Sequence, residues 1–369
     1  MSSTLKEIAQ QLRNSDKKVQ LIYAFNGTGK TRLSREYTEL VASRSLESNN
    51  NELGYRNILY YNALTEDLFY WDNDSASPLL KIHRNIFTQW MLKDQGLDQE
   101  VVNNFQKYVD KNLTPRFNDD FSEVTFTLQH GDDETSDDLK ISRGEESNFI
   151  WSFFYTLLSE VISVLNKEDE RGTSQFDHLE HIFIDDPVSS LDQNHLIELA
   201  FNLSEVINSS QSRLKFLITT HNPLFYNVLY KELELNKKGK KEGCYLLERH
   251  ANGTYELNTK YGDSNKSFSY HLHLIKILKK AISDNEIERY HFILLRNLYE
   301  KTASFLGYPK WSELLPDDKN NYYNRIIQFT SHSTLPSETP ASPSAPEQQI
   351  VNFLLQHLLE TYSFWHNME

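Results

Sequence analysis

The sequence has very little cysteine, and this scarcity excludes several kinds of site. Cys244 is the one cysteine in 369 residues. A single thiol forms neither an internal disulfide nor a cysteine-based zinc site. Runs of about 18 consecutive apolar residues are absent, and residues 1–18 lack the apolar core of a signal peptide. We therefore expect no transmembrane helix, no membrane association and a cytoplasmic location.

Basic residues are in the minority, and their distribution is uneven. The chain has 38 Lys and Arg against 52 Asp and Glu, a net charge of −14. This balance argues against broad nonspecific coating of DNA. From Leu229 to Lys301, however, 14 basic residues face 10 acidic ones, a local balance of +4. Such a region can bind a polyanion within an acidic protein, although a solvated surface is the simpler interpretation.

The N-terminal part alternates apolar strands with helices, which predicts a mostly parallel α/β sheet. Residues 45–140, with short strands, acidic Asn-rich loops and a helix near Lys81–Lys93, are expected to form an inserted lobe. The expected sheet strands and their helices are a helix Thr4–Leu12, a strand Val19–Phe25, a helix Phe149–Leu165, a strand His181–Asp186, a helix Asn194–Asn208 and a strand Leu214–Asn222.

The C-terminal part has a different pattern. Leu229–Lys260 is interpreted as a β-rich lobe around the lysine-rich turn NKKGKKEG, and SETPASPSAPE (337–347) as a linker or exposed loop. Helical patterns cover Tyr270–Ala281, Glu286–Leu306, Asn320–Phe329 and Gln348–Tyr362. The sequence therefore predicts an α/β domain over residues 1–260 and a mainly α-helical domain over residues 261–369.

The stretch FNGTGKT follows a predicted strand and opens a helix, which is the context of a phosphate-binding loop. Its glycines let backbone N–H groups surround phosphate oxygens, its lysine reaches the β- and γ-phosphates, and its last threonine is a magnesium ligand. Ala24 stands where the usual motif has its first glycine. The predicted nucleotide-binding residues of the loop are Asn26, Gly27, Thr28, Gly29, Lys30 and Thr31.

A second acidic motif completes the expected nucleotide site. In IFIDDP an apolar strand ends at Asp185, which places this carboxylate beside the metal together with Thr31. Asp186 follows where a glutamate usually polarises the attacking water, and its shorter side chain is expected to slow hydrolysis. The site therefore calls for Mg²⁺ with a nucleoside triphosphate, either ATP or GTP.

Three further segments resemble the ATP-binding-cassette (ABC) ATPases. SSLD, which ends at Asp192, and His221 at a strand end fall where these ATPases carry their dimer loop and switch histidine. ISRGEES opens a helix and resembles the cassette signature through Ser142 and Gly144, whereas Arg143 and Glu145 depart from the commonest pattern. The resemblance implies a head-to-tail homodimer with nucleotides at its interface, and a tetramer stays open.

The whole chain is similar to a narrower family. KVQLIYAFNGTGKTRLSREY, the order of the cassette motifs, YGDSNKSFSYH and RNLYE together resemble the PrrC anticodon nucleases. The resemblance implies an ABC-type ATPase domain followed by a helical nuclease domain of the HEPN class. It implies nucleotide-gated cleavage of tRNA, typically lysine tRNA, at the wobble base in antiphage defence by abortive infection. The implied silencing partner is a type I DNA restriction–modification complex, and dTTP is a further candidate nucleotide.

The family's nuclease triad maps to Arg296, Glu300 and His332. Cleavage that leaves a 2′,3′-cyclic phosphate and a 5′-hydroxyl uses the substrate's own 2′-hydroxyl, so this site requires no metal. Glu300 and His332 can serve as base and acid in either order, and Arg296 can stabilise the charge of the phosphorane. The family's anticodon-recognition peptide maps to Lys260–Tyr270, where the implied contact residues are Tyr261, Asp263, Lys266 and Tyr270.

Other interpretations stay open at the level of the sequence. Taken locally, Arg296 and Glu300 are an ordinary surface ion pair, and Tyr261 and Tyr270 are core residues. An SMC- or RecF-like DNA-repair ATPase would need a long coiled coil or a broad basic face, and the sequence has neither. A regulatory ABC-type ATPase that controls a separate effector nuclease is the remaining alternative.

Overall fold

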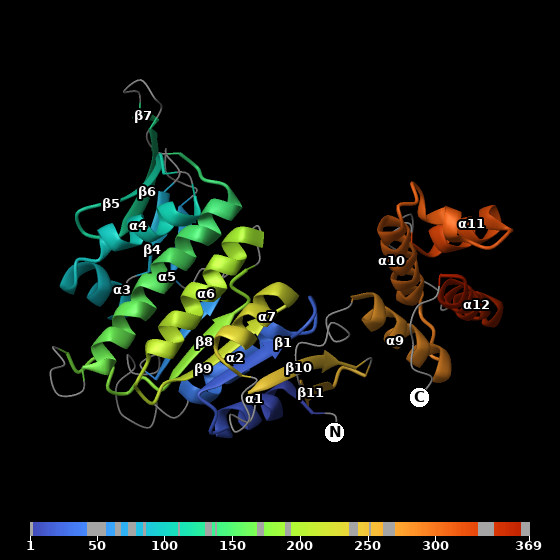
Figure 1. Ribbon diagram of the computed structural model, residues 1–369, viewed down its shortest axis with the longest axis horizontal. Coiled ribbons are helices and arrows are strands. Elements are labelled where there is room, and N and C mark those ends of the chain that lie inside the picture. The colour runs from blue at the N-terminus through green and yellow to red at the C-terminus, as the bar shows by residue number, and fades with distance from the viewer. Residues whose placement is uncertain are drawn as a thin grey trace. The chain divides into compact units, whose positions relative to one another are not determined.

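The computed structural model divides the chain into two compact units, Met1–Asp263 and Ser264–Glu369. We call them the N-terminal and C-terminal units; Figure 1 colours the first from blue to yellow and the second in orange and red. The structure describes residues 3–42, 57–62, 68–72, 79–83, 86–109, 111–129, 135–136, 139–167, 173–188, 193–235, 243–250, 252–260, 270–330 and 343–362.

A six-stranded sheet forms the centre of the N-terminal unit, in the order β11-β10-β1-β9-β8-β2. The strands from β10 to β2 are parallel, and only β11 is antiparallel to its neighbour. All residues of β1 and β8 are buried, as expected of parallel strands covered on both faces. The strands are β1 Val19–Tyr23, β2 Ile58–Asn62, β8 His181–Asp185, β9 Lys215–Thr220, β10 Cys244–Arg249 and β11 Tyr255–Thr259.

Helices cover both faces of this sheet, because successive residues of a strand point to opposite sides. On β1, Ile22 packs in a cluster with α1 and α2, whereas the neighbouring Tyr23 meets Tyr226 of α7 edge to face. Figure 1 shows α5, α6 and α7 in front of the strands. The helices are α1 Leu5–Asn14, α2 Lys30–Ala42, α5 Arg143–Asn166, α6 Gln193–Ser209 and α7 Pro223–Glu232. The expected α/β architecture is therefore confirmed.

Among the described residues, α5 is the one helix that is both long and strongly apolar. By length and composition it could cross a membrane, with a mean hydropathy of 1.4 over its best window. However, 72% of that window is buried inside the protein. Its Trp151 and Phe154 pack against Tyr61 of the central sheet, with ring centroids 5.2 and 4.8 Å away. Its apolar composition is therefore explained by its place in the core.

A second, antiparallel sheet in the order β3-β4-β6-β5 forms the inserted lobe, and β7 pairs with β6. Two details of the predicted lobe are wrong. Residues 58–62 form β2 of the central sheet, and Lys81 lies in β4 because the helical segment begins only at Ile86. The elements are β3 Phe69–Asp72, β4 Leu79–Ile82, α3 Ile86–Gln89, a π-helix Trp90–Asp94, α4 Asp98–Tyr108, β5 Leu113–Phe117, β6 Glu123–Gln129 and β7 Thr135–Ser136.

Within Leu229–Lys260, the expected β-rich lobe, the structure has strands β10 and β11, whereas the residues up to Glu232 belong to α7. Strand β10 pairs in parallel with β1, so β10 and β11 extend the central sheet. Gly243 precedes β10 and lies so close to β1 that an added Cβ would be 2.0 Å from the Val19 carbonyl oxygen. Only glycine permits this approach without a shift of the backbone.

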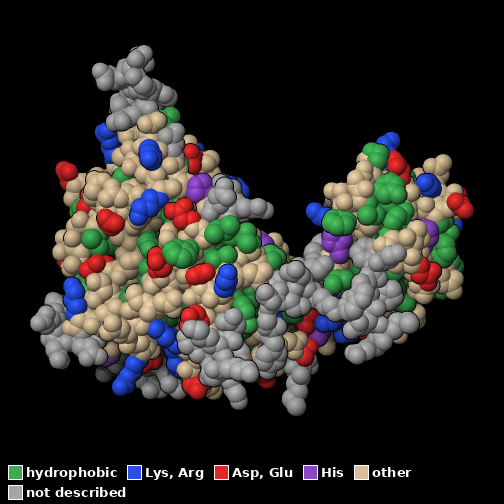
Figure 2. All heavy atoms as spheres, viewed as in Figure 1, with side chains coloured by type: hydrophobic (Ala, Val, Ile, Leu, Met, Phe, Trp, Pro, Cys, Tyr) green, Lys and Arg blue, Asp and Glu red, His purple; other side chains and the backbone are tan. Residues whose placement is uncertain are grey.

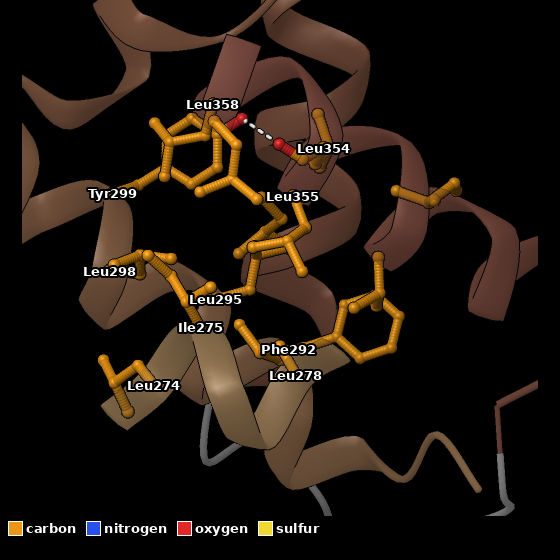
Figure 3. Close-up of a cluster of buried hydrophobic side chains, with 14 of the residues drawn as sticks. Leu274, Ile275, Leu278, Phe292, Leu295, Leu298, Tyr299, Leu354, Leu355 and Leu358 are labelled. Atoms are coloured by element: carbon orange, nitrogen blue, oxygen red, sulfur yellow. Dashed lines mark hydrogen bonds between the residues drawn. The ribbon is translucent and has the colours of Figure 1, made fainter. Parts of the chain in front are cut away.

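The described residues of the C-terminal unit form helices packed around one hydrophobic core. Figure 3 shows that α9, α10 and α12 contribute leucines, an isoleucine, a phenylalanine and Tyr299 to this core. The Tyr299 hydroxyl donates to the Leu354 carbonyl oxygen at 2.9 Å. The predicted linker (337–347) ends earlier than expected, because Ser344 caps α12. The helices are α9 Tyr270–Ser283, α10 Arg289–Leu306, a 3₁₀ helix Trp311–Leu314, α11 Lys319–Thr330 and α12 Ala345–Thr361.

Candidate functional site

The phosphate-binding loop connects β1 to the first residue of α2. Gly27 and Gly29 have φ angles of +77° and +114°, a region that side chains other than glycine rarely adopt. Ala24, which replaces the motif's first glycine, is fully buried, and its N–H donates to the Thr220 carbonyl oxygen at 2.9 Å. It continues the pairing of β1 with β9 and does not have a positive φ. The alanine therefore fits this backbone without strain.

Lys30 begins α2 with its side chain turned into the loop. It is only 7% exposed, and its ammonium group lies 3.3 Å from each of three oxygen atoms: Ala24 O, Asn26 Oδ1 and Asp186 Oδ2. A buried ammonium group with this set of acceptors is held where a phosphate would be bound. Asn26, Lys30 and Asp186, which the sequence predicts to act together, are therefore neighbours in the structure.

Asp185 is the centre of a buried hydrogen-bond network. Its carboxylate accepts from Thr219 Oγ1 at 2.5 Å, from Asn62 Nδ2 at 3.1 Å and from Ser34 Oγ at 3.4 Å. Burial raises the pKa of Asp185, while hydrogen bonds from Thr219 and Thr31 oppose that rise. The register explains the cluster, because Asn62 and Thr219 are the cross-strand neighbours of Asp185 at the same sheet edge.

Asn62, Ser34 and Thr219 are site residues that the sequence analysis missed. Thr219 lies two residues before the predicted His221, and Ser34 lies one turn after Lys30 on α2. Their short distances along the chain from predicted site residues could have identified both. Asn62 had no such signal, because its role depends on the pairing of β2 with β8 across more than 100 residues.

Asp186 joins the phosphate loop to His221. Its oxygens lie 2.7 and 2.8 Å from His221 Nδ1, and Oδ1 accepts from the His221 backbone N–H at 3.2 Å. Although burial acts to raise the pKa of Asp186, its hydrogen bonds from His221 and the charge of Lys30 hold that pKa below its usual value. Asp186 also has a φ of +51°, which is uncommon outside glycine. Such local strain is typical of functional sites.

The oxygen atoms at this edge suit a magnesium ion. Mg²⁺ prefers carboxylate, hydroxyl and phosphate oxygens, and it commonly binds through one or two protein ligands. The Thr31 side chain hydrogen-bonds to the Asp185 carboxylate, so these two predicted ligands are adjacent. Among the described residues, no group of three or more His, Cys, Asp or Glu could hold a metal by itself. The donor set therefore fits an ion that also binds nucleotide oxygens.

Ser142 and Gly144 lie apart from this network, at the N-terminus of α5. The Ser142 hydroxyl accepts from the Glu145 N–H at 3.3 Å, and the Glu145 carboxylate accepts from the Ser142 N–H at 2.7 Å. This reciprocal capping box gives Glu145 a structural role at the start of the helix. The role of Ser142 and Gly144 in the site of a second subunit stays a prediction.

Arg296 and Glu300 form a direct ion pair on α10. Arg296 Nε donates to Glu300 Oε1 at 2.7 Å, and the two side chains are 33% and 38% exposed. The Arg296 guanidinium carbon lies 6.0 Å from the centre of the Trp311 ring. Glu300 lines a surface pocket of about 780 Å³ together with residues of the 3₁₀ helix and α11. The pair is therefore held at the edge of a space that a ligand can enter.

Several predicted site residues lie outside the described residues. Of the predicted recognition peptide, Lys260 is 4% exposed, and its ammonium group lies 4.7 Å from the centre of the Tyr226 ring, so this lysine packs inside the protein. Tyr270 begins α9. The side chain of Tyr270 and the residues Tyr261, Asp263, Lys266, Asp192 and His332 are outside the described part.

The phosphate loop, the paired aspartates and the α/β sheet define a nucleotide-binding unit of the P-loop ATPase class. In agreement, the family model for an AAA domain matches residues 91–350, a range that begins after the phosphate loop itself. An anticodon nuclease of Escherichia coli is 56% identical over 395 residues, covering 99% of this chain and 98% of that protein. The chain belongs to the PrrC-type anticodon nuclease family.

Solved structures give weaker similarities. The SMC head domain from Thermotoga maritima is 11% identical, with a TM-score of 0.28, over 67% of this chain and 92% of that one. An SMC head bound to the C-terminal winged-helix domain of ScpA is 9% identical, with a TM-score of 0.33, over 67% and 91%.

Proposed function

We propose that this protein is a nucleotide-gated endoribonuclease that cleaves tRNA in the anticodon loop. The observation that carries the proposal is the Arg296–Glu300 pair beside an open pocket, in a chain 56% identical to an anticodon nuclease. The helical C-terminal unit is assigned as the nuclease domain of the HEPN class, and the N-terminal unit as the domain that senses nucleotides.

In the proposed reaction, the 2′-hydroxyl at the cut site attacks the adjacent phosphorus, and the P–O bond to the 5′ oxygen breaks. One of Glu300 and His332 removes the 2′ proton, and the other protonates the departing 5′ oxygen. Arg296 stabilises the charge on the phosphorane through its N–H groups. The products are a 2′,3′-cyclic phosphate and a 5′-hydroxyl, and no metal takes part.

The N-terminal unit would bind Mg²⁺ with ATP, GTP or dTTP. Lys30 and the N–H groups of the phosphate loop hold the phosphates, while Thr31 and Asp185 hold the metal, which when bound neutralises phosphate charge. Asp186 and His221 are hydrogen-bonded to each other, and they would orient a water molecule and respond to the γ-phosphate. Nucleotide binding between two such units of a homodimer, or of a tetramer, would control the nuclease.

The finer assignments follow from the family. Lysine tRNA is the proposed substrate, cut at the wobble base, with Asp263 as the residue that reads this base and Tyr261, Lys266 and Tyr270 as further contacts. The proposed biological setting is cytoplasmic abortive-infection defence against phage. In this setting, a type I DNA restriction–modification complex keeps the nuclease silent.

The test compares Ala variants of Arg296, Glu300 and His332 in the purified full chain. Each variant is expected to lose tRNA cleavage while it keeps nucleotide binding, and Arg289→Ala, on the same helix as Arg296, is the charge-matched control. Sequencing of the RNA ends gives the cut position. A substrate with hydrogen in place of the 2′-hydroxyl at that position should resist cleavage. Undiminished cleavage by the Arg296 and Glu300 variants would refute the assignment. If tRNA is cleaved only when a second protein is added, the protein is instead a regulatory ATPase that controls a separate nuclease.

A further inference from the structure

The pocket beside Glu300 has a wall that the proposed chemistry does not use. Its volume is about 780 Å³, within the range of small-ligand sites. It is formed by the end of α10, the 3₁₀ helix and the start of α11. The lining side chains used below are Glu300, Lys310, Trp311, Lys319, Asn320 and Tyr323.

Trp311 and Tyr323 form an aromatic platform in this wall. Their rings are stacked, with centroids 5.1 Å apart and planes 28° from parallel. Beneath them, the buried Tyr299 meets Trp311 edge to face at 6.3 Å, and Tyr299 itself is fixed by its hydrogen bond to Leu354. The platform therefore has a rigid support in the core of the unit.

Tyr323 presents part of its ring to the pocket. Its neighbour Tyr322 packs against the hydrophobic core, whereas Tyr323 lines the pocket and is 37% exposed. Figure 2 shows hydrophobic side chains gathered on the visible face of the C-terminal unit. Stacked aromatic rings of this kind offer a flat surface on which another flat ring can stack.

Two lysines and two glutamates line the pocket, Lys310 and Lys319 with Glu300 and Glu313, and the lysines are the groups that can contact phosphate oxygens. Lys310, Lys319 and Asn320 are exposed at the rim, and Lys319 Nζ is oriented by a hydrogen bond to the Glu313 carbonyl oxygen at 3.1 Å. Arg296 connects the platform to the nuclease pair, because it lies over Trp311 and binds Glu300. A ligand on the platform is therefore next to the proposed reacting phosphate.

We propose that this pocket binds one unpaired nucleotide next to the scissile phosphate, with its base stacked on the exposed ring of Tyr323, which Trp311 supports from the other side. This inference rests on the proposed function and adds to it the residues that hold the substrate. Lys310 and Lys319 contact the flanking phosphates. A base in a duplex has both faces covered by its neighbours, so the platform selects single-stranded RNA, such as a loop, and tolerates any base.

The test measures binding of an anticodon stem-loop RNA to the full chain, with hydrogen replacing the 2′-hydroxyl at the cut site to prevent cleavage. Tyr323→Ala is expected to raise the Kd by on the order of 5- to 100-fold, as loss of one stacked base predicts. Tyr323→Phe should stay within about twofold, because it keeps the ring. Phe305→Ala is the matched control, since Phe305 is 85% exposed on α10 and does not line the pocket.

A double-mutant cycle then identifies the stacked nucleotide. Each loop base in turn is removed from the RNA to leave an abasic site. At one position next to the cut, Tyr323→Ala should then cause no further loss of RNA affinity. Photocrosslinking of the unaltered chain to RNA with 4-thiouridine at that position should label Trp311 or Tyr323. This measurement requires no variant to fold. Additive losses at every position, together with no crosslink to either ring, overturn the inference.

Failure of this inference is distinguishable from failure of the proposed function. If the unaltered chain cleaves the RNA while Tyr323→Ala binds it with unchanged Kd, only the platform is wrong. If the unaltered chain does not cleave the stem-loop, the proposed function is wrong. The platform is then tested with short oligoribonucleotides. Crosslinking to Trp311 or Tyr323 supports it, and absence of a crosslink overturns it.

Discussion

We expect His181 to make the N-terminal unit less stable in mild acid. It is the first residue of β8 and is 5% exposed, with Nδ1 3.0 Å from the Tyr37 hydroxyl. Burial, helped by the positive charges of Lys215 and Arg13, lowers the pKa of His181 from 6.5 to about 4. The carboxylate of Glu180 is 3.8 Å from Nε2, but it is 71% exposed and opposes this shift only weakly.

The sign follows from proton binding. Between pH 6.5 and pH 4 the unfolded chain binds a proton at this histidine that the folded chain does not, so stability decreases as the pH falls through this window. At 1.36 kcal/mol per pKa unit, the loss from this one group is about 2 kcal/mol at pH 5 and about 3 kcal/mol below pH 4.

Urea unfolding of the full chain at pH 7.5 and pH 5, followed by circular dichroism, measures this loss. His181→Gln keeps a partner for Tyr37 but has no proton to gain, so the stability difference between the two pH values should shrink by about 2 kcal/mol. His178→Gln, a change at an exposed histidine of the same segment, is the control and should leave the difference unaltered. The reasoning is refuted if the change in unfolding free energy between pH 7.5 and pH 5 is the same for His181→Gln and the unaltered chain to within about 0.5 kcal/mol. Measurements at independent sites usually scatter by that amount.

Two further substitutions test the nucleotide site and the C-terminal core. Asp186→Asn removes the carboxylate that binds His221 and Lys30, so nucleotide hydrolysis should fall by about 100-fold or more while nucleotide Kd changes little, as phosphate release and binding assays would measure. An equal loss of binding contradicts this. Tyr299→Phe removes the hydrogen bond from the buried hydroxyl to the Leu354 carbonyl and should cost about 0.5–1.5 kcal/mol in urea unfolding, and an unchanged midpoint would argue against that role.

The sequence was informative where the structure depends on neighbouring residues. The phosphate loop, β8 and the N-terminus of α5 are defined by short segments, so their residues could be predicted together with the strand or helix that carries them. Asn62 and the β10–β11 hairpin could not be predicted in this way. Their positions are decided by the pairing of β2 with β8 and of β10 with β1, which lie far apart in the chain.

The same reasoning explains why the sheet edge, rather than any single motif, forms the nucleotide site. Parallel strands end at one edge, and there the register brings Asn62, Asp185 and Thr219 side by side. Asp186, one residue further, leaves the strand with a positive φ, and its carboxylate contacts both Lys30 and His221. The short aspartate side chain reaches both partners from this backbone position.

The Arg296–Glu300 pair allows function to be separated from folding. An arginine four residues before a glutamate is the less favourable order on a helix, because the helix dipole prefers the acid first. Since both side chains are about one-third exposed, the pair contributes only about 0.3–0.5 kcal/mol to stability. Alanine at either position should therefore leave the fold almost unaltered. If cleavage then falls by far more than this small loss of stability can explain, the effect must come from the chemistry at the pocket.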